Sequence, residues 1–127
     1  MNEFVKGYDD DAGEDIVLDD YLDIKPGFSK IILPAQYTPA KGEVAFLVAR
    51  GSTANVGIFP IAVAIDTGYE GQLTAWIVNT SERTVFKPGE RAFAVVNLKL
   101  APSRGKNVKV ARPGQQRGSN KEASSGQ

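Results

Sequence analysis

Residues 58–79 read IFPIAVAIDTGYEGQLTAWIVN, two apolar runs with turn residues between them. Its second half alternates: Leu73, Ala75 and Ile77 share one side, while the positions between them hold Thr, Trp and Val. A period of two is typical of a β-strand whose two faces meet different surroundings. The Asp-Thr-Gly step in the middle carries turn residues between two apolar runs. The stretch therefore predicts two strands joined by a tight turn.

The rest of the chain repeats this pattern. Short runs rich in Val, Ile, Phe and Leu are separated by Gly, Pro, Asn, Asp and Ser, which is typical of successive strands. The predicted strands are Asp15–Leu18, Ser29–Leu33, Val44–Ala49, Ile58–Ile65, Gln72–Asn79 and Arg91–Leu100. No window of twelve residues has helical periodicity, and the nearest candidate, Thr53–Gly57, is long enough only for a turn or two.

Two Lys-Pro-Gly tripeptides precede predicted strands, at residues 25–27 and 87–89. Pro at the second position and Gly at the third are what a type II turn prefers. Many short strands with regular turns predict an all-β protein, a jelly-roll-like distorted β-barrel. We expect this domain to span residues 1–100, and residues 101–127 to form a flexible basic C-terminal arm, because that segment has few large apolar side chains.

The composition excludes several kinds of chemistry. Among 127 residues there is neither Cys nor His. Disulfides, thiolate nucleophiles and zinc–sulfur sites are thereby excluded, and so is the commonest general base. Any catalysis must use carboxylates, hydroxyls, Tyr, Lys, Arg or backbone amides. Any metal should be a hard cation held by oxygen, with Mg²⁺ carried on phosphates the obvious case.

Charge is divided between the two ends. Residues 1–24 carry nine acidic side chains against one Lys, whereas residues 101–127 carry six Lys or Arg against one Glu. A basic tail can bind a polyanion, but a solvated tail explains the same composition, and we expect no nucleic-acid partner. No apolar run approaches the ~20 residues of a membrane span. With no signal-peptide pattern either, we expect no membrane partner and a cytoplasmic location.

The Asp66-Thr67-Gly68-Tyr69-Glu70-Gly71 segment can be read simply as a turn, but it also resembles the third motif of the homotrimeric dUTPase family. That resemblance implies a catalytic Asp66, which accepts a proton from the attacking water, and a Tyr69 ring that packs under deoxyribose and excludes ribose. Gly71 would support the turn. A carboxylate base suits a chain without His.

The segment Arg50-Gly51-Ser52 resembles the family's Arg-Ser-Ser or Arg-Ser-Gly motif. A turn rich in Gly and hydroxyls offers donors to phosphate oxygens, and Arg adds charge. The resemblance implies that Arg50, Gly51 and Ser52 bind substrate phosphates, although Gly51 stands where the family has Ser. The compact spacing is also similar to the dCTP deaminases, whose catalytic Glu is replaced here by Trp76.

Three further segments resemble family motifs. Pro88-Gly89-Glu90-Arg91 matches Pro-Gly-Glu-Arg, which implies a phosphate-side role for Arg91, but the family Gln is Ala94 here. The segment 12–16 resembles the first motif and implies that Asp15 supports the triphosphate and its Mg²⁺. The tail aligns with the closing motif at the positions Arg117, Gly118, Ser125 and Gly126, with Glu122 where the family stacks Phe on uracil.

The resemblance implies a dUTP diphosphatase that gives dUMP and diphosphate, with Mg²⁺ carried by the substrate and no direct metal ligand. It also implies a homotrimer whose arm crosses to a neighbour. The alternative is a protein of the same fold that binds a nucleotide or serves as a regulatory or structural subunit without catalysis. The segment between Gly57 and Asp66 is about two residues short of the family, with Pro60 near a base-reading Asn, so the sequence leaves the preferred base open.

Overall fold

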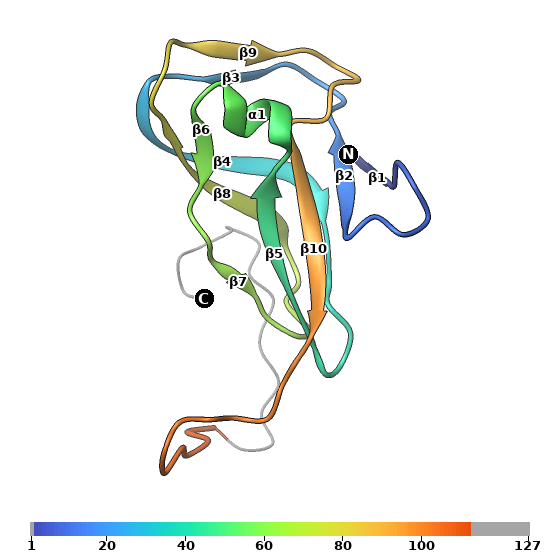
Figure 1. Ribbon diagram of the computed structural model, residues 1–127, viewed down its shortest axis with the longest axis vertical. Helices are drawn as coiled ribbons and strands as arrows, with labels where there is room; N and C mark the ends of the chain where they lie inside the picture. The colour runs from blue at the N-terminus through green and yellow to red at the C-terminus, as the bar shows by residue number, and fades with distance from the viewer. Residues whose placement is uncertain (1, 113–127) are drawn as a thin grey trace.

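The computed structural model describes residues 2–112 (Figure 1). Apart from one helix of five residues, α1 (Gly51–Asn55), the regular structure of this part of the chain is all β. Its strands are β1 (Glu3–Val5), β2 (Gly13–Val17), β3 (Leu22–Ile24), β4 (Gly27–Gln36), β5 (Glu43–Ala49), β6 (Ile58–Pro60), β7 (Ala64–Ile65), β8 (Gln72–Asn79), β9 (Thr84–Phe86) and β10 (Phe93–Lys99). The predicted all-β class is confirmed.

The strands form three antiparallel sheets. The largest has the order β1-β2-β10-β5-β7, the second β4-β8-β6, and the third pairs β3 with β9. Because non-consecutive strands pair, as β2 does with β10, the connections cross between sheets in the manner of a jelly roll. Within residues 2–112 the three sheets do not join into one continuous closed barrel.

Each sheet turns an apolar face inward because side chains alternate along a strand. In β8 the alternation predicted from the sequence holds: Leu73, Ala75 and Ile77 are at most 2% exposed, while the positions between them are partly exposed. Phe93 and Val95 of β10 face the same interior. The core therefore lies between the five-stranded and three-stranded sheets.

The predicted strand Ile58–Ile65 is wrong as one element. It ends at Pro60, and β7 begins only at Ala64. The two pieces belong to different sheets, since β6 pairs with β8 and β7 pairs with β5. The Ile61 N–H still donates to the Trp76 carbonyl of β8 at 2.7 Å, and the chain then crosses to the other sheet before Ala64.

Three strands were not predicted, namely β1, β3 and β9, each of three residues. The expected helical turn at Thr53–Gly57 begins two residues earlier, as α1. Both predicted Lys-Pro-Gly turns place their Gly in the left-handed region, with φ 88° at Gly27 and at Gly89. In the second, the Glu90 N–H donates to the Lys87 carbonyl at 3.0 Å, which closes the turn.

The chain leaves the sheets directly after β10. After β10, the Leu100 N–H donates to the Gly42 carbonyl at 2.8 Å, and residues 101–112 then extend away from the sheets (Figure 1). The one helix in residues 2–112 lacks the length and apolarity that a membrane span requires.

Candidate active site

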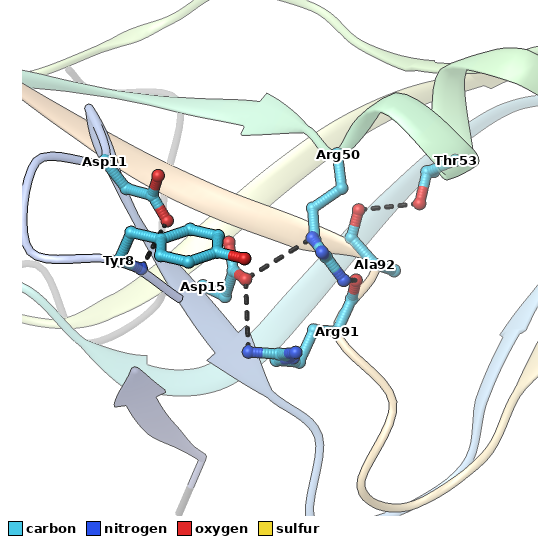
Figure 2. A network of polar contacts seen from close by, with 7 residues as sticks. All are labelled: Tyr8, Asp11, Asp15, Arg50, Thr53, Arg91 and Ala92. Atoms are coloured by element: carbon cyan, nitrogen blue, oxygen red, sulfur yellow. Dashed lines mark hydrogen bonds and ion pairs between the residues drawn. The ribbon is translucent and has the colours of Figure 1, made fainter. Parts of the chain in front are cut away.

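Two arginines meet at one carboxylate on the five-stranded sheet. Asp15 lies on β2, Arg50 directly follows β5, and Arg91 lies two residues before the start of β10. The Asp15 Oδ2 atom is 3.3 Å from Arg50 Nε and 3.5 Å from Arg91 Nη1 (Figure 2). The fold therefore brings together three of the predicted site residues from three distant segments of sequence.

Backbone contacts fix this cluster. The Arg50 N–H donates to the Ala92 carbonyl at 3.1 Å, and Arg50 Nη1 donates to the Arg91 carbonyl at 3.2 Å. The buried Thr53 hydroxyl of α1 donates to the same Ala92 carbonyl at 2.7 Å (Figure 2). The start of α1 is thus tied to the start of β10, which holds the backbones that carry the two arginines next to each other.

The cluster borders an open polar cleft of about 270 Å³. Its lining residues are Arg50, Ser52, Thr53, Phe86, Gly89, Glu90 and Arg91. The Arg50 and Arg91 side chains are 38% and 36% exposed, so their guanidinium groups remain accessible to a ligand. Two guanidinium groups and a hydroxyl beside a cleft can bind the oxygens of a phosphate chain.

Sequence reasoning missed Thr53, Phe86 and Glu90 as residues of this cleft. Thr53 directly follows the Arg-Gly-Ser segment, and Glu90 lies inside the Pro-Gly-Glu-Arg segment, so adjacency to those motifs is the signal that could have found them. Phe86 ends β9, a strand that the sequence did not predict. Ala94, where the family has Gln, is buried and pairs with Asp15 in the ladder.

The Asp66–Tyr69 turn forms the second group of predicted site residues. Asp66 follows β7 and is partly exposed, and its carbonyl accepts the Tyr69 N–H at 3.0 Å. The Thr67 hydroxyl donates to the Glu43 carbonyl, which ties the turn to the start of β5. Gly68 and Gly71 have φ of 76° and 137°, conformations that favour Gly. The predicted supporting role of Gly71 thus has a backbone reason.

Tyr69 is almost enclosed within its own chain. The residue is 4% exposed, and its hydroxyl donates to the Gln72 carbonyl at 2.8 Å. Burial raises the pKa of the Tyr69 phenol above its usual value. The ring borders a shallow apolar pocket of about 30 Å³ whose other walls include Ile65 and Trp76.

The two groups lie at opposite ends of β5. Ile65 pairs with Ala45, so Asp66 adjoins the beginning of β5, whereas Arg50 follows its end. The six residue-to-residue steps from Val44 to Arg50 span about 20 Å at the rise of an extended strand. Within one chain, Asp66 and Tyr69 therefore do not meet the arginine cluster. Arg117, Gly118 and Ser125 lie outside the described residues, and their roles stay predictions.

No protein-family model matches the chain. Among curated proteins, the Pol polyprotein of Caprine arthritis encephalitis virus is 31% identical over 91 residues, which is 71% of this chain and 8% of that protein. The dCTP deaminase of Aeropyrum pernix is 35% identical over 82 residues, 64% of this chain and 46% of that protein. The chain thus spans less than half the length of either relative.

Solved structures resemble the chain along most of its length. EIAV dUTPase has a TM-score of 0.70 at 16% identity, with 86% of this chain and 92% of that chain covered. A mutant dUTPase of Staphylococcus bacteriophage 80alpha with dUpNHpp has a TM-score of 0.66 at 21% identity, with 87% and 89% covered.

These likenesses identify the fold. The chain has a dUTPase-like fold, which is the fold that its motifs predicted. Its jelly-roll β architecture is the one that the solved dUTPases share.

Proposed function

We propose that the protein hydrolyses dUTP to dUMP and diphosphate. The observation that carries this proposal is the arginine cluster: in a dUTPase fold, Arg50 and Arg91 converge on one cleft at distances of 3.3 and 3.5 Å from the Asp15 carboxylate. Ser52 lines the same cleft, and Gly51 beside it is exposed. A triphosphate needs several such donors in one place, because each charge-assisted bond holds one oxygen.

Asp66 is the proposed general base. Its carboxylate follows β7 on a turn fixed by the Tyr69 N–H and the Thr67 hydroxyl, which suits a group that must hold one water in line for attack. The proton of that water would pass to a carboxylate oxygen of Asp66 as the water oxygen bonds to the α-phosphorus, and the bond from that phosphorus to the bridging oxygen would break, so that diphosphate leaves with the bonding electron pair. The Tyr69 ring would pack under the sugar, where a 2′-hydroxyl would clash.

Mg²⁺ would arrive on the substrate. In the described part of the chain, acidic side chains do not gather in a group of three or more that could hold a metal ion. Asp15, which contacts the two arginines of the cleft, has both of them on its Oδ2 atom. This donor set fits a hard cation bound mainly by phosphate oxygens, where it would neutralise charge on the transferred group.

The distance between the two residue groups supports a site shared between copies. Because Arg50 and Asp66 lie about 20 Å apart along β5, one copy would supply the cleft and another the Asp66–Tyr69 turn. We propose the homotrimer that the family resemblance implies, with the arm residues Arg117, Gly118 and Ser125 reaching a neighbouring site.

An apolar face is available for such contacts. On the outer side of the β4-β8-β6 sheet, Phe28 and Phe59 flank Val78 in register, and they are 64% and 46% exposed. Ile32 of β4 and Ile61, directly after β6, are also exposed. Contiguous exposed apolar side chains of this kind mark association surfaces.

The alternative function is nucleotide binding without hydrolysis. It is favoured by Ala94, which is buried beside Asp15 and offers no side-chain amide where the motif has Gln. Diphosphate release measured with dUTP, dCTP, dTTP and UTP in the presence of Mg²⁺ separates the two. We expect release from dUTP and far less from UTP. Nucleotide binding without release from any of the four would support the alternative.

A further inference from the structure

The Asp15 carboxylate serves both arginines through a single atom. Oδ2 lies 3.3 Å from Arg50 Nε and 3.5 Å from Arg91 Nη1, and the Asp15 side chain is only 16% exposed. Arg50 comes from the end of β5 and Arg91 from the approach to β10. A carboxylate between two guanidinium groups holds them side by side, because each is attracted to the same oxygen and each would otherwise repel the other.

The acidic side chains of the cleft offset its basic ones. Asp15 and Glu90 stand against Arg50 and Arg91, so the formal charges of these four residues cancel. Glu90 is fixed by its turn, where its Oε1 accepts the Lys87 N–H at 2.6 Å. A phosphate cleft built from two arginines is therefore much less positive than the arginines alone would make it.

We propose that Asp15 is a positioning residue that aligns Arg50 and Arg91 and also lowers the affinity of the cleft for free diphosphate. This inference rests on the proposed function, since it assigns the cleft to a phosphate chain. Free diphosphate carries more negative charge than a phosphate chain neutralised by a divalent cation, so a nearby carboxylate repels it more strongly. Asp15 thereby favours a phosphate chain that carries a divalent cation over diphosphate without one.

Replacing the charge while keeping the shape tests this role. We expect Asp15→Asn to tighten the binding of diphosphate, measured by calorimetry on the full chain without metal, by on the order of fivefold, the effect of one unit charge a few ångströms away in a well-solvated site. Asp15→Glu keeps the charge and should bind diphosphate as the wild type does. Asp20→Asn, an exposed acid outside the cleft, controls for the change in net charge.

Salt distinguishes electrostatics from a structural effect. The difference between wild type and Asp15→Asn should shrink as salt rises from about 0.05 M to 1 M, because screening shortens the reach of the carboxylate. A difference caused by distorted packing would persist. If Asp15→Asn does not fold, Asp15→Ser removes the same charge with a smaller side chain and carries the same expectation.

In dUTP hydrolysis, Asp15→Asn should lower kcat, because the two arginines lose the carboxylate that aligns them.

The outcomes separate this proposal from the proposed function. Diphosphate that binds the wild type but binds Asp15→Asn equally or more weakly overturns the role of Asp15 and leaves the phosphate cleft standing. If diphosphate binds neither protein and Arg91→Ala does not change dUTP turnover, the phosphate cleft is overturned, and this inference with it. Tighter binding to Asp15→Asn in a protein that hydrolyses no nucleotide supports the role of Asp15 and contradicts the proposed hydrolysis alone.

Discussion

Asp66 is the carboxylate on which the proposed hydrolysis depends. Asp66→Asn keeps the shape of the side chain but removes the base, so turnover of dUTP should fall at least ~10²-fold. Steady-state diphosphate release measures this effect. Glu70→Gln removes an exposed carboxylate from the same turn and should leave turnover nearly unchanged. Full activity in Asp66→Asn would remove Asp66 from the mechanism.

At the level of single residues, the sequence predicted the arginine cluster in part. Arg50, Arg91 and Asp15 each stand in a motif that resembles one of the family. The resemblance therefore predicted that all three would lie on the phosphate side of one site. Their contact through one Oδ2 atom could not, because it depends on the pairing of Asp15 with Ala94 across β2 and β10. The enclosure of Tyr69, at 4% exposure, likewise depends on tertiary packing.

Among the elements, the connection from α1 to β6 is the most constrained. Gly57 has φ 88°, its carbonyl accepts both the N–H and the hydroxyl of Thr80, and an added Cβ would lie 2.5 Å from the Thr80 hydroxyl. Gly42 has a similar φ of 81°, but an added Cβ would lie in open space there. Comparing alanine substitutions at Gly57 and Gly42 therefore separates the cost of backbone strain from the cost of side-chain crowding.

Gly57→Ala should therefore destabilise the fold more than Gly42→Ala. The left-handed backbone alone costs an alanine about 1–2 kcal/mol, and crowding against Thr80 adds about 1–3 kcal/mol. Urea unfolding of both variants measures the free energies. Equal costs for the two would mean that Thr80 moves aside without penalty.

The β3–β9 pair is fastened by an exposed ion pair. Arg83 Nε donates to Asp23 Oδ1 at 2.8 Å, and the Arg83 guanidinium holds the pKa of the Asp23 carboxyl below its usual value. A depressed folded pKa stabilises the fold above the unfolded carboxyl pKa of about 3.9, and this contribution is lost as the pH falls through the lower folded value.

Arg83→Gln should therefore lower the urea midpoint slightly at neutral pH and have a smaller effect in acid, as the pH falls through the lowered pKa of Asp23. The neutral-pH difference should also fade in about 1 M salt. A difference that is the same at neutral and at acid pH would show that Arg83 acts through packing rather than through its charge.

The sequence predicted long strands better than short ones. β8 was predicted residue for residue, since its period of two reflects a core face and an outer face. The three-residue strands β1, β3 and β9 exist only through partners far along the chain, as when Leu22 pairs with Phe86. The break after Pro60 was missed because an apolar run does not reveal that the chain changes sheets.

For the whole molecule, the decisive question is whether copies complete one another. Arg50→Gln and Asp66→Asn should each be inactive alone, because each removes one half of a shared site. Mixed after unfolding and refolded together, they should recover part of the wild-type turnover, since some sites then combine an intact Arg50 with an intact Asp66.

The matched control mixes Arg50→Gln with Arg91→Ala. These two residues line one cleft of the same copy, so every site in the mixture still lacks one arginine, and no turnover should return. Recovery in both mixtures, or in neither, would contradict a site divided between copies at β5.

The division into residues 1–100 and an arm stays a prediction, as does the part that the arm plays in closing the site.

One aromatic contact on the outer sheet face gives the protein an optical property. Trp76 is the single tryptophan of the chain, and the Lys30 ammonium lies 5.9 Å from its ring centroid across β4 and β8. An indole emits at longer wavelength in water than in apolar surroundings, so the emission of Trp76 should shift to the blue when this face is covered. All intrinsic tryptophan fluorescence therefore originates on the sheet that carries Phe28 and Phe59, and its colour reports how much of that face meets water.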